Sequence, residues 1–420
     1  MSKHTRATFP AGGTAWPELK AEMVKRTAGD ADWKSGRTAI FFFMANEEAY
    51  EVGKRAFMEH FSENALGAAR AYPGLAQMER DVIDYGLDLL HAPEGGRGAF
   101  TTGGTESILL AVKSARDRHR AAGKGKAGQP LNLVMPVTGH PAFDKAAILM
   151  DVEVRRAPLR PDRRVDVGAL KALVDENTFI IVGSAPCFPH GVIDPIGEIA
   201  AFALERDVWM HVDACVGGWV APFFERIGRG TPVFDFRHEG VRSMSADLHK
   251  FGFAPKPSST VFFRDGEDLE RSTFRLGFWP SGMYATATMS GSRPAGAVAG
   301  AWAVLNHLGT SGYEQAARDL SAMTDAYVAG IRAMRDLELW AEPDVTILNF
   351  GSNTLDIYAV AERMRARGWI PGLTSEPRGM HTMLSMQHAP AREAWLADMS
   401  ASLDEVRATK AKSDLAATYS

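Results

Sequence analysis

The chain has very few cysteines, since Cys187 and Cys215 are the only two among 420 residues. This scarcity excludes a disulfide framework and is typical of proteins from a reducing compartment. A chain of this length buries enough apolar surface to fold without disulfide or metal staples. No His/Cys cluster has the spacing of a zinc site, so we expect no metal. We expect both cysteines to act as small buried hydrophobic residues.

Long apolar runs and an excess of one charge are also lacking. No stretch approaches the ~20 apolar residues that cross a bilayer, and the polar first ten residues contain no signal-peptide core. The 47 Lys and Arg residues nearly balance the 51 Asp and Glu residues, for a net charge of −4. Nucleic-acid binding requires a concentrated basic face, which this balance does not favour. We therefore expect a cytoplasmic protein with no membrane anchor and no nucleic-acid partner.

The middle of the chain alternates short β-rich runs with helical stretches. The spacing predicts strands at 131–137, 152–159, 179–184, 208–213, 241–245 and 260–264, and helices between them at 140–150, 167–175 and 197–206. Strands separated by helices of this length indicate βαβ units and an α/β fold, a mostly parallel sheet with helices on both faces. Ligands of such sheets bind at the carboxyl ends of the strands.

The two ends of the chain have mainly helical spacing. Helices are predicted at 17–27, 49–60, 74–90 and 108–120 before the sheet, and at 295–308, 313–337, 354–367 and 391–406 after it, with strand-like pieces at 345–350 and 380–386. We divide the chain into an N-terminal arm (1–60), a large domain (61–305) and a smaller C-terminal α+β domain (306–420).

The sharpest chemical signal is an acid and a lysine that follow two predicted strands. Asp213 ends the apolar strand before it, and Lys250 lies in a later polar turn after His249. Pyridoxal phosphate chemistry needs such a pair, because a lysine amine attaches to the aldehyde and a carboxylate keeps the pyridine nitrogen protonated. Either residue alone would favour the alternative of an ordinary polar residue at a strand end.

A glycine pair before a helix adds a third element. Gly103 and Gly104 precede Thr105, which opens the helix predicted from residue 108. Backbone amides and a hydroxyl at such a helix start can close around a phosphate. The alternative is that Thr105 simply caps the helix with no ligand.

Six strings in a fixed order carry a family resemblance over about residues 64–390. They are GGTESIL (103–109), HPAFDKA (140–146), FPHGVIDP (188–195), HVDAC (211–215), SADLHKFG (245–252) and GSRP (291–294). The chain resembles the group II, fold-type I pyridoxal-phosphate enzymes, the family of glutamate and aromatic amino-acid decarboxylases. Within that family the strings resemble the sphingosine-1-phosphate lyases, and the polar N-terminus resembles their soluble bacterial form.

The resemblance implies a fold and a set of site residues. It implies the cofactor pyridoxal 5′-phosphate, a seven-stranded cofactor domain, and a homodimer in which active sites are shared and the arm packs on the partner. Lys250 would be the Schiff-base lysine, Asp213 the partner of the pyridine nitrogen, and His140 the side chain stacked on the ring. The implied phosphate contacts are Gly104, Thr105 and His249, with Ser292 reaching the cofactor phosphate of the neighbouring subunit.

Some positions depart from the lyase pattern near the substrate. Phe43 stands where the lyases have a tyrosine and Gly67 where they have a histidine, and both family residues lie near the substrate's phosphate. Lys256 matches the family. Arg70 and Arg378 are extra cations that could replace lost anion contacts, the alternative being ordinary surface arginines.

Three reaction classes remain open. The leading one is a carbon–carbon lyase that cleaves a 2-amino-3-hydroxy substrate by a retro-aldol reaction, with an altered substrate preference. The second is a small-molecule amino-acid α-decarboxylase, which would use every one of the same cofactor residues. The third is a non-catalytic protein that retains the fold, which the presence of both Lys250 and Asp213 disfavours. Because Phe43 and Gly67 lack polar side chains, we expect sphingosine-1-phosphate to be a poor substrate; the alternative is that basic residues rebuild its phosphate site.

Overall fold

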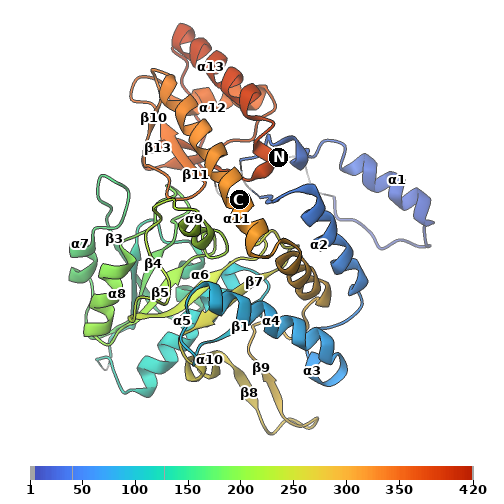
Figure 1. The fold of residues 1–420 in the computed structure, drawn as a ribbon, viewed down its shortest axis with the longest axis vertical. Coiled ribbons are helices and arrows are strands. Elements are labelled where there is room, and N and C mark those ends of the chain that lie inside the picture. The colour runs from blue at the N-terminus through green and yellow to red at the C-terminus, as the bar shows by residue number, and fades with distance from the viewer. Residues whose placement is uncertain (1–4, 40, 127, 419–420) are drawn as a thin grey trace.

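A seven-stranded sheet forms the centre of the computed structural model, which describes residues 5–39, 41–126 and 128–418 (Figure 1). The strand order is β1-β7-β6-β5-β4-β2-β3, and β7 runs antiparallel to the other six strands. The strands are β1 (Arg97–Thr101), β2 (Asn132–Pro136), β3 (Glu153–Ala157), β4 (Thr178–Ser184), β5 (Trp209–Asp213), β6 (Val241–Ala246) and β7 (Ser259–Phe263). The prediction of a mostly parallel sheet is confirmed.

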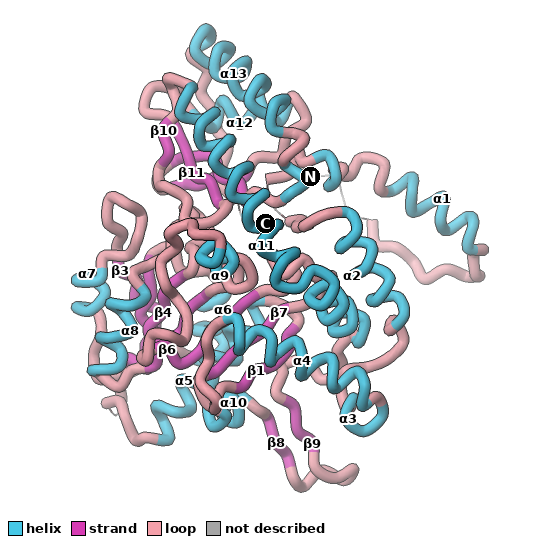
Figure 2. The backbone as a smooth tube through the Cα atoms, viewed as in Figure 1, coloured by secondary structure: helices cyan, strands magenta, loops and turns pink. Residues whose placement is uncertain are grey.

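Helices cover both faces of this sheet (Figure 2). They are α4 (Pro73–Leu89), α5 (Gly104–Ala121), α6 (Ala142–Met150), α7 (Val167–Ala172), α8 (Ile196–Glu205), α9 (Ala221–Arg226) and α10 (Gly266–Ser272). Alternate residues of β4 enter different cores: Ile180 packs in the cluster of α5 and α6, whereas Ile181 packs in the cluster of α8. Every residue of β4 is buried, because a parallel strand has helices on both sides.

A smaller unit follows at the C-terminal end of the chain. Its antiparallel sheet has the order β10-β11-β13-β12, with β10 (Glu338–Leu339), β11 (Ile347–Gly351), β12 (Gly372–Ser375) and β13 (Arg378–Met383). Helices α12 (Ile357–Ala366) and α13 (Arg392–Thr409) and the short η2 (Met386–His388) complete it. The predicted smaller α+β unit is confirmed.

The long helix α11 (Ala295–Ala333) connects the two units. Gly309 interrupts it with φ 55° and ψ −174°, a conformation that favours glycine. Before the interruption the helix lies against α2 (Glu47–Glu59), where Gly53 closely approaches Val304; after it, the helix packs on α13 through Tyr327 and Trp395. The boundary that we placed between residues 305 and 306 stays a prediction, close to this interruption.

The N-terminal segment contacts the C-terminal unit of its own chain. Thr38 bridges to Ile370, and the amide of Met383 donates to the carbonyl of Ala39 at 2.8 Å. By contrast, α1 (Trp16–Arg26) has no buried residue and projects from the body (Figure 1). The arm is therefore divided into a part fixed to its own chain and an exposed helix.

The remaining elements are η1 (Trp33–Ser35), α3 (Ala68–Ala71), β8 (Phe274–Leu276) and β9 (Tyr284–Thr286).

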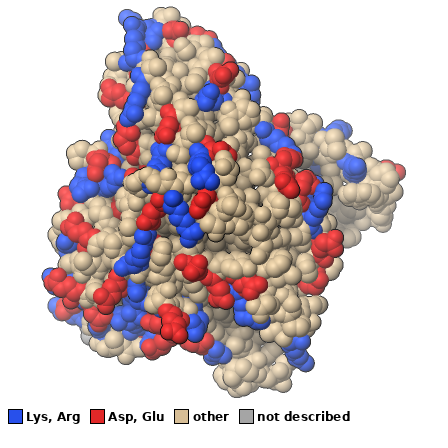
Figure 3. Space-filling model, in the orientation of Figure 1, with Lys and Arg blue, Asp and Glu red and all other residues tan. Residues whose placement is uncertain are grey.

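Charges of both signs mingle on the surface. On the face in Figure 3, Lys and Arg side chains alternate with Asp and Glu side chains over most of the body. Among the described residues, no helix is long and apolar enough to span a bilayer.

Candidate active site

Polar residues gather where the parallel strands of the large sheet end. Asp213 is the last residue of β5, and the turn that carries Asp247 and Lys250 follows β6. His140 follows β2, and it interacts electrostatically with Asp213, Asp247 and Lys250. Gly104 begins α5 directly after β1. The carboxyl ends of parallel strands meet at one edge of a sheet, which is why residues so far apart in the chain meet here.

Lys250 forms an ion pair inside this cluster. Its Nζ lies 2.9 Å from Oδ2 of Asp247, and both side chains are largely buried. Burial by itself would lower the pKa of Lys250, but the Asp247 carboxylate more than offsets this and raises the pKa above its usual range. Burial would raise the pKa of Asp247, and the charges of Lys250 and His249 instead hold it below its usual value. The amine is therefore kept as an ammonium ion next to a carboxylate.

Asp213 is held by one of its two oxygens. Its Oδ1 accepts hydrogen bonds from the amide of Cys215 and from Oγ of Ser245, each at 3.2 Å. Ser245 stands opposite Asp213 in the register of β5 and β6. Among the described residues, no hydrogen bond to Oδ2 is present, so this oxygen is available to a ligand.

The start of α5 is shaped by Gly104. A Cβ there would lie 2.6 Å from Sγ of Cys215 and 2.9 Å from Oδ1 of Asp247, so no larger residue fits without movement. The helix is capped by Gly103 with no side-chain hydrogen bond, and Thr105 lies within the first turn. Thr105 is thus not the cap that our alternative described. The first amides of α5 are the kind of site that binds phosphate.

Two histidines border the cluster. Nδ1 of His249 accepts from the amide of Ser258 at 3.3 Å, and its ring lies against Gly103. Nδ1 of His140 accepts from the amide of Ala142 at 3.1 Å. Burial lowers the pKa of both rings. His140 also lines a cavity of about 890 Å³ between the large sheet and the small unit.

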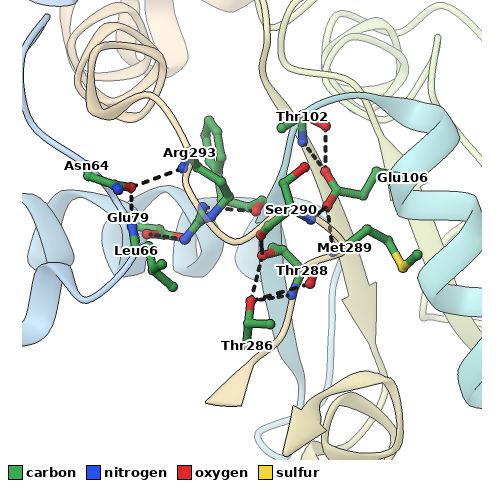
Figure 4. Close-up of polar contacts among 11 residues, drawn as sticks. Asn64, Leu66, Glu79, Thr102, Glu106, Thr286, Thr288, Met289, Ser290 and Arg293 are labelled. Atoms are coloured by element: carbon green, nitrogen blue, oxygen red, sulfur yellow. Dashed lines mark hydrogen bonds and ion pairs between the residues drawn. The ribbon is translucent and has the colours of Figure 1, made fainter. Parts of the chain in front are cut away.

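A carboxylate fastens the start of α5 to a distant loop (Figure 4). Oε2 of Glu106 accepts from both the amide and the hydroxyl of Thr102 at 2.6 Å, while Oε1 accepts from the amides of Met289 and Ser290 at 2.7 and 3.2 Å. The same loop carries Ser292, whose Oγ accepts from Nδ2 of Asn64 at 3.0 Å. Glu106 thereby links the glycine pair to the loop that carries Ser292.

The predicted substrate residues lie in different places. Phe43 and Lys256 line one cavity of about 330 Å³, together with His249, so the structure does bring these two together. Gly67 lies at the start of α3, outside the residues that line this cavity. Arg70 is exposed on α3. Arg378 pairs with Asp356 and stacks on the ring of Tyr358, and is not among the described residues that line either cavity.

Sequence reasoning missed three residues of this site: Asp247, Ser245 and Glu106. Asp247 stood three positions before Lys250 within a matched string, so its position was a usable signal. The roles of Ser245 and Glu106 depend on strand register and on a loop far along the chain, for which the sequence has no local signal.

Both cysteines are free and buried, as expected of small hydrophobic residues. Burial raises the pKa of Cys187 to about 12 and that of Cys215 well above its usual value. Among the described residues, no three His, Cys, Asp or Glu side chains form a metal-binding group.

The donor set fits pyridoxal phosphate. The cluster offers a buried amine, a strand-end carboxylate with one oxygen available, and a glycine cradle at a helix start. Oδ1 of Asp247 is buried without a hydrogen-bond partner among the described residues. The carboxylate that pairs with the lysine amine therefore has one oxygen whose hydrogen-bonding capacity is unused. An amine, an acid and a phosphate cradle are the three groups that this cofactor requires.

Comparisons with known proteins agree with this geometry. Residues 58–352 match the family model described as the pyridoxal-dependent decarboxylase conserved domain. The chain is 39% identical to the sphingosine-1-phosphate lyase of Arabidopsis thaliana, over 93% of this chain and 72% of that protein. The structure of a Burkholderia pseudomallei sphingosine-1-phosphate lyase superposes with a TM-score of 0.91 at 33% identity, covering 97% of this chain and 95% of the other. A probable L-tyrosine/L-aspartate decarboxylase of Methanothermobacter thermautotrophicus is 32% identical, over 80% and 89% of the two chains.

Proposed function

The chain belongs to the pyridoxal-dependent decarboxylase family, and from this premise we propose that it is a carbon–carbon lyase that cleaves a 2-amino-3-hydroxy substrate by a retro-aldol reaction. The observation that carries the proposal is the similarity to sphingosine-1-phosphate lyases along almost the whole chain, in sequence and in fold. Such an enzyme breaks the bond between Cα and Cβ, releasing an aldehyde and a shorter amine.

The cofactor is pyridoxal 5′-phosphate. When bound, it supplies an aldehyde that attaches to amines and a ring that accepts electrons from a breaking bond at Cα. We assign Lys250 as the lysine that holds the aldehyde and Asp213 as the partner of the pyridine nitrogen through its available oxygen. The phosphate would be held at the start of α5 by Gly104 and Thr105, with His249 beside it.

The protein's own groups orient the substrate and hold protons. Since Nδ1 of His140 accepts a backbone hydrogen bond and burial lowers the ring's pKa, its neutral form carries the proton on Nε2. His140 would therefore cover the cofactor ring as a neutral side chain, with Nδ1 engaged by the backbone. The Lys250–Asp247 pair holds a proton at Nζ within the same cluster.

Replacing Lys250 and Asp213, one at a time, tests the assignment of the cofactor-binding residues. Lys250→Ala should lose the visible absorbance of the bound cofactor and all turnover, and Asp213→Ala should bind the cofactor weakly. Lys256→Ala is the matched control, because it removes a neighbouring cation outside the cluster and should keep the absorbance. Retention of both absorbance and turnover in Lys250→Ala would refute the assignment.

Amino-acid decarboxylation is the second candidate, favoured by the likeness to the Methanothermobacter decarboxylase. Both reactions use the same cofactor residues and differ in which bond to Cα breaks. Product analysis separates them, since an aldehyde with a shorter amine supports the lyase and release of CO₂ from an amino acid supports the decarboxylase.

We further propose that sphingosine-1-phosphate is a poor substrate and that an amine or amino acid with a smaller or uncharged tail is preferred. Phe43 offers no hydroxyl in the cavity that it shares with Lys256, and Gly67 has no side chain. A lost hydrogen bond to a charged group costs ~1.5–3 kcal/mol, so the loss at Phe43 by itself weakens phosphate recognition by ~10–10²-fold. Efficient turnover of sphingosine-1-phosphate by the unmodified protein would overturn this preference.

The active unit is proposed to be a cytoplasmic homodimer with shared active sites. Helix α1 exposes Trp16 and Met23, and the segment between β8 and β9 exposes Phe278 and Trp279. Exposed apolar side chains grouped in this way are typical of interfaces. In such a dimer Ser292 would reach the cofactor phosphate of the partner. Sedimentation tests this proposal, which a fully active monomer would contradict. Two buried, unpaired cysteines support a reducing compartment.

A further inference from the structure

A chain of hydrogen bonds runs behind Asp213, between β5 and β6. Nε1 of Trp209 lies 2.8 Å from Oγ of Ser243, which lies 2.8 Å from Nδ1 of His211. Nε2 of His211 lies 3.3 Å from Oγ of Ser245, which lies 3.2 Å from Oδ1 of Asp213. Each of the four contacts crosses between β5 and β6, because His211 stands opposite Ser243 and Asp213 opposite Ser245. All five side chains are buried.

The carboxylate at one end and a neutral His211 fix the direction of every proton in this chain. A carboxylate only accepts, so Ser245 donates its one hydrogen to Asp213 and must accept from Nε2 of His211. A neutral ring that carries its proton on Nε2 accepts at Nδ1, so Ser243 donates to His211. The indole N–H of Trp209 only donates, and Ser243 accepts it.

The surroundings of Ser245 and His211 support this direction. Cys215 contributes a further contact, with its Sγ 3.3 Å from Oγ of Ser245, and its thiol stays protonated because burial raises its pKa. Ser245 thus uses one donor and two acceptor positions, its full capacity. Burial lowers the pKa of His211 to about 4 against the opposing effect of Asp213, so the ring is neutral. The ring of Phe143 packs against His211 in a T-shaped contact and offers no competing acceptor.

We propose that Ser245 and His211 are positioning residues for Asp213. They belong to a hydrogen-bond relay that runs in one direction from Trp209 and ends at Oδ1 of Asp213. Holding Oδ1 in this way presents Oδ2 to the pyridine nitrogen of the cofactor. The inference rests on the proposed role of Asp213. Neither residue touches the reacting atoms in this arrangement. Their effect is to fix the orientation of the carboxylate before the cofactor binds.

Three serine-to-alanine variants test the relay through cofactor binding. A hydrogen bond to a charged group accounts for a change of about 10- to 100-fold in an equilibrium constant, so Ser245→Ala should raise the dissociation constant of the cofactor by that factor and alter the absorbance of the holoenzyme. Ser243→Ala acts one step further away and should have a smaller effect. Ser114→Ala is the matched control, because it removes a buried hydroxyl of α5 that donates to the carbonyl of Asp268. It should lower the melting temperature without changing cofactor affinity.

Restoring the hydroxyl separates positioning from packing. Ser245→Thr should recover most of the cofactor affinity. If Ser245→Ala binds the cofactor as tightly as the unmodified protein, with the same absorbance, the relay has no positioning role and the proposal is wrong.

The tautomer of His211 provides a test that uses the unmodified protein and does not depend on the stability of any variant. In the unmodified holoenzyme labelled with ¹⁵N-histidine, the buried ring should be neutral with its proton on Nε2; a proton on Nδ1, or on both nitrogens, would overturn the relay. This outcome is independent of the proposed function. If Lys250→Ala and Asp213→Ala lose the cofactor while Ser245→Ala does not, only the relay fails; if Asp213→Ala binds the cofactor normally, the role of Asp213 itself fails.

Discussion

Nζ of Lys250 lies 2.9 Å from Oδ2 of Asp247, beneath the start of α5, where Gly104 leaves just enough room for the carboxylate. The other oxygen of Asp247 has no hydrogen-bond partner among the described residues. Nζ of Lys250 and, at 3.6 Å, Nε2 of His249 are the basic groups that lie next to this buried carboxylate. The state of the lysine amine before cofactor attachment thus depends on its neighbour three positions earlier in the chain.

Replacing Asp247 should change the pH dependence of cofactor attachment. Burial lowers the pKa of Lys250 and Asp247 raises it, so in Asp247→Asn the burial effect remains and the pKa falls. Attachment to the aldehyde requires the neutral amine. The rate of cofactor uptake by the apoprotein should therefore reach its half-maximum at a lower pH than in the unmodified protein, as stopped-flow absorbance would show.

A surface carboxylate is the control for this change. Asp144 pairs with Arg156 at the surface, so Asp144→Asn should leave the pH profile in place. An unchanged or upward-shifted profile in Asp247→Asn would contradict the role assigned to the pair.

Gly104→Ala should destabilise the protein and weaken cofactor binding. The new methyl group would lie 2.6 Å from Sγ of Cys215 and 2.9 Å from Asp247, and overpacking of this kind costs about 1–3 kcal/mol. Gly103→Ala is the matched control, since its methyl group would meet only the ring of His249 at 3.8 Å. Thermal unfolding of the two apoproteins measures the difference. Adding Cys215→Ala should recover part of the lost stability, and equal melting temperatures for the two glycine variants would contradict this packing.

Glu106→Gln should loosen the loop that carries Ser292. The amide group keeps one acceptor oxygen where the carboxylate has two, so one side of the link between Thr102 and residues 289–290 must break (Figure 4). Hydrogen exchange of the peptide covering residues 286–293 should accelerate by about tenfold or more, since a hydrogen bond to a charged group is lost. Exchange of α12 should stay unchanged, and an unaltered loop would show that Glu106 does not hold it.

Phe43→Tyr should increase turnover of phosphorylated amino alcohols. The new hydroxyl would enter the cavity that contains Lys256 and supply a donor worth about tenfold in kcat/KM. Activity on unphosphorylated substrates should change little. Phe43→Leu, which adds no donor, is the control, and an equal gain in both variants would exclude a hydrogen bond as the cause. Gly67→His is a less suitable test, because Gly67 has φ +71°, which strains any other residue.

The sequence by itself determined the fold class and predicted the central residues of the candidate site. Alternating strand and helix patterns located β2 to β7, because buried strands and amphipathic helices leave local periodicities in the chain. Short strings of residues likewise predicted Lys250 and Asp213 as site residues, because each lies in a run of consecutive residues that can be recognised without knowing the fold.

Only the tertiary structure decided the contacts between those segments. Strand β1 was not predicted, because it begins in a glycine-rich stretch that has no strand periodicity. It is a strand because β7 pairs with it. Ser245 supports Asp213 only through the register of β5 and β6, and Glu106 reaches a loop far along the chain. Arg378 is paired with Asp356 and is not among the described residues that line the cavities of His140 and Lys256. Strand register and packing across the sheet bring together residues that are remote in sequence, and no local periodicity records which of them will meet.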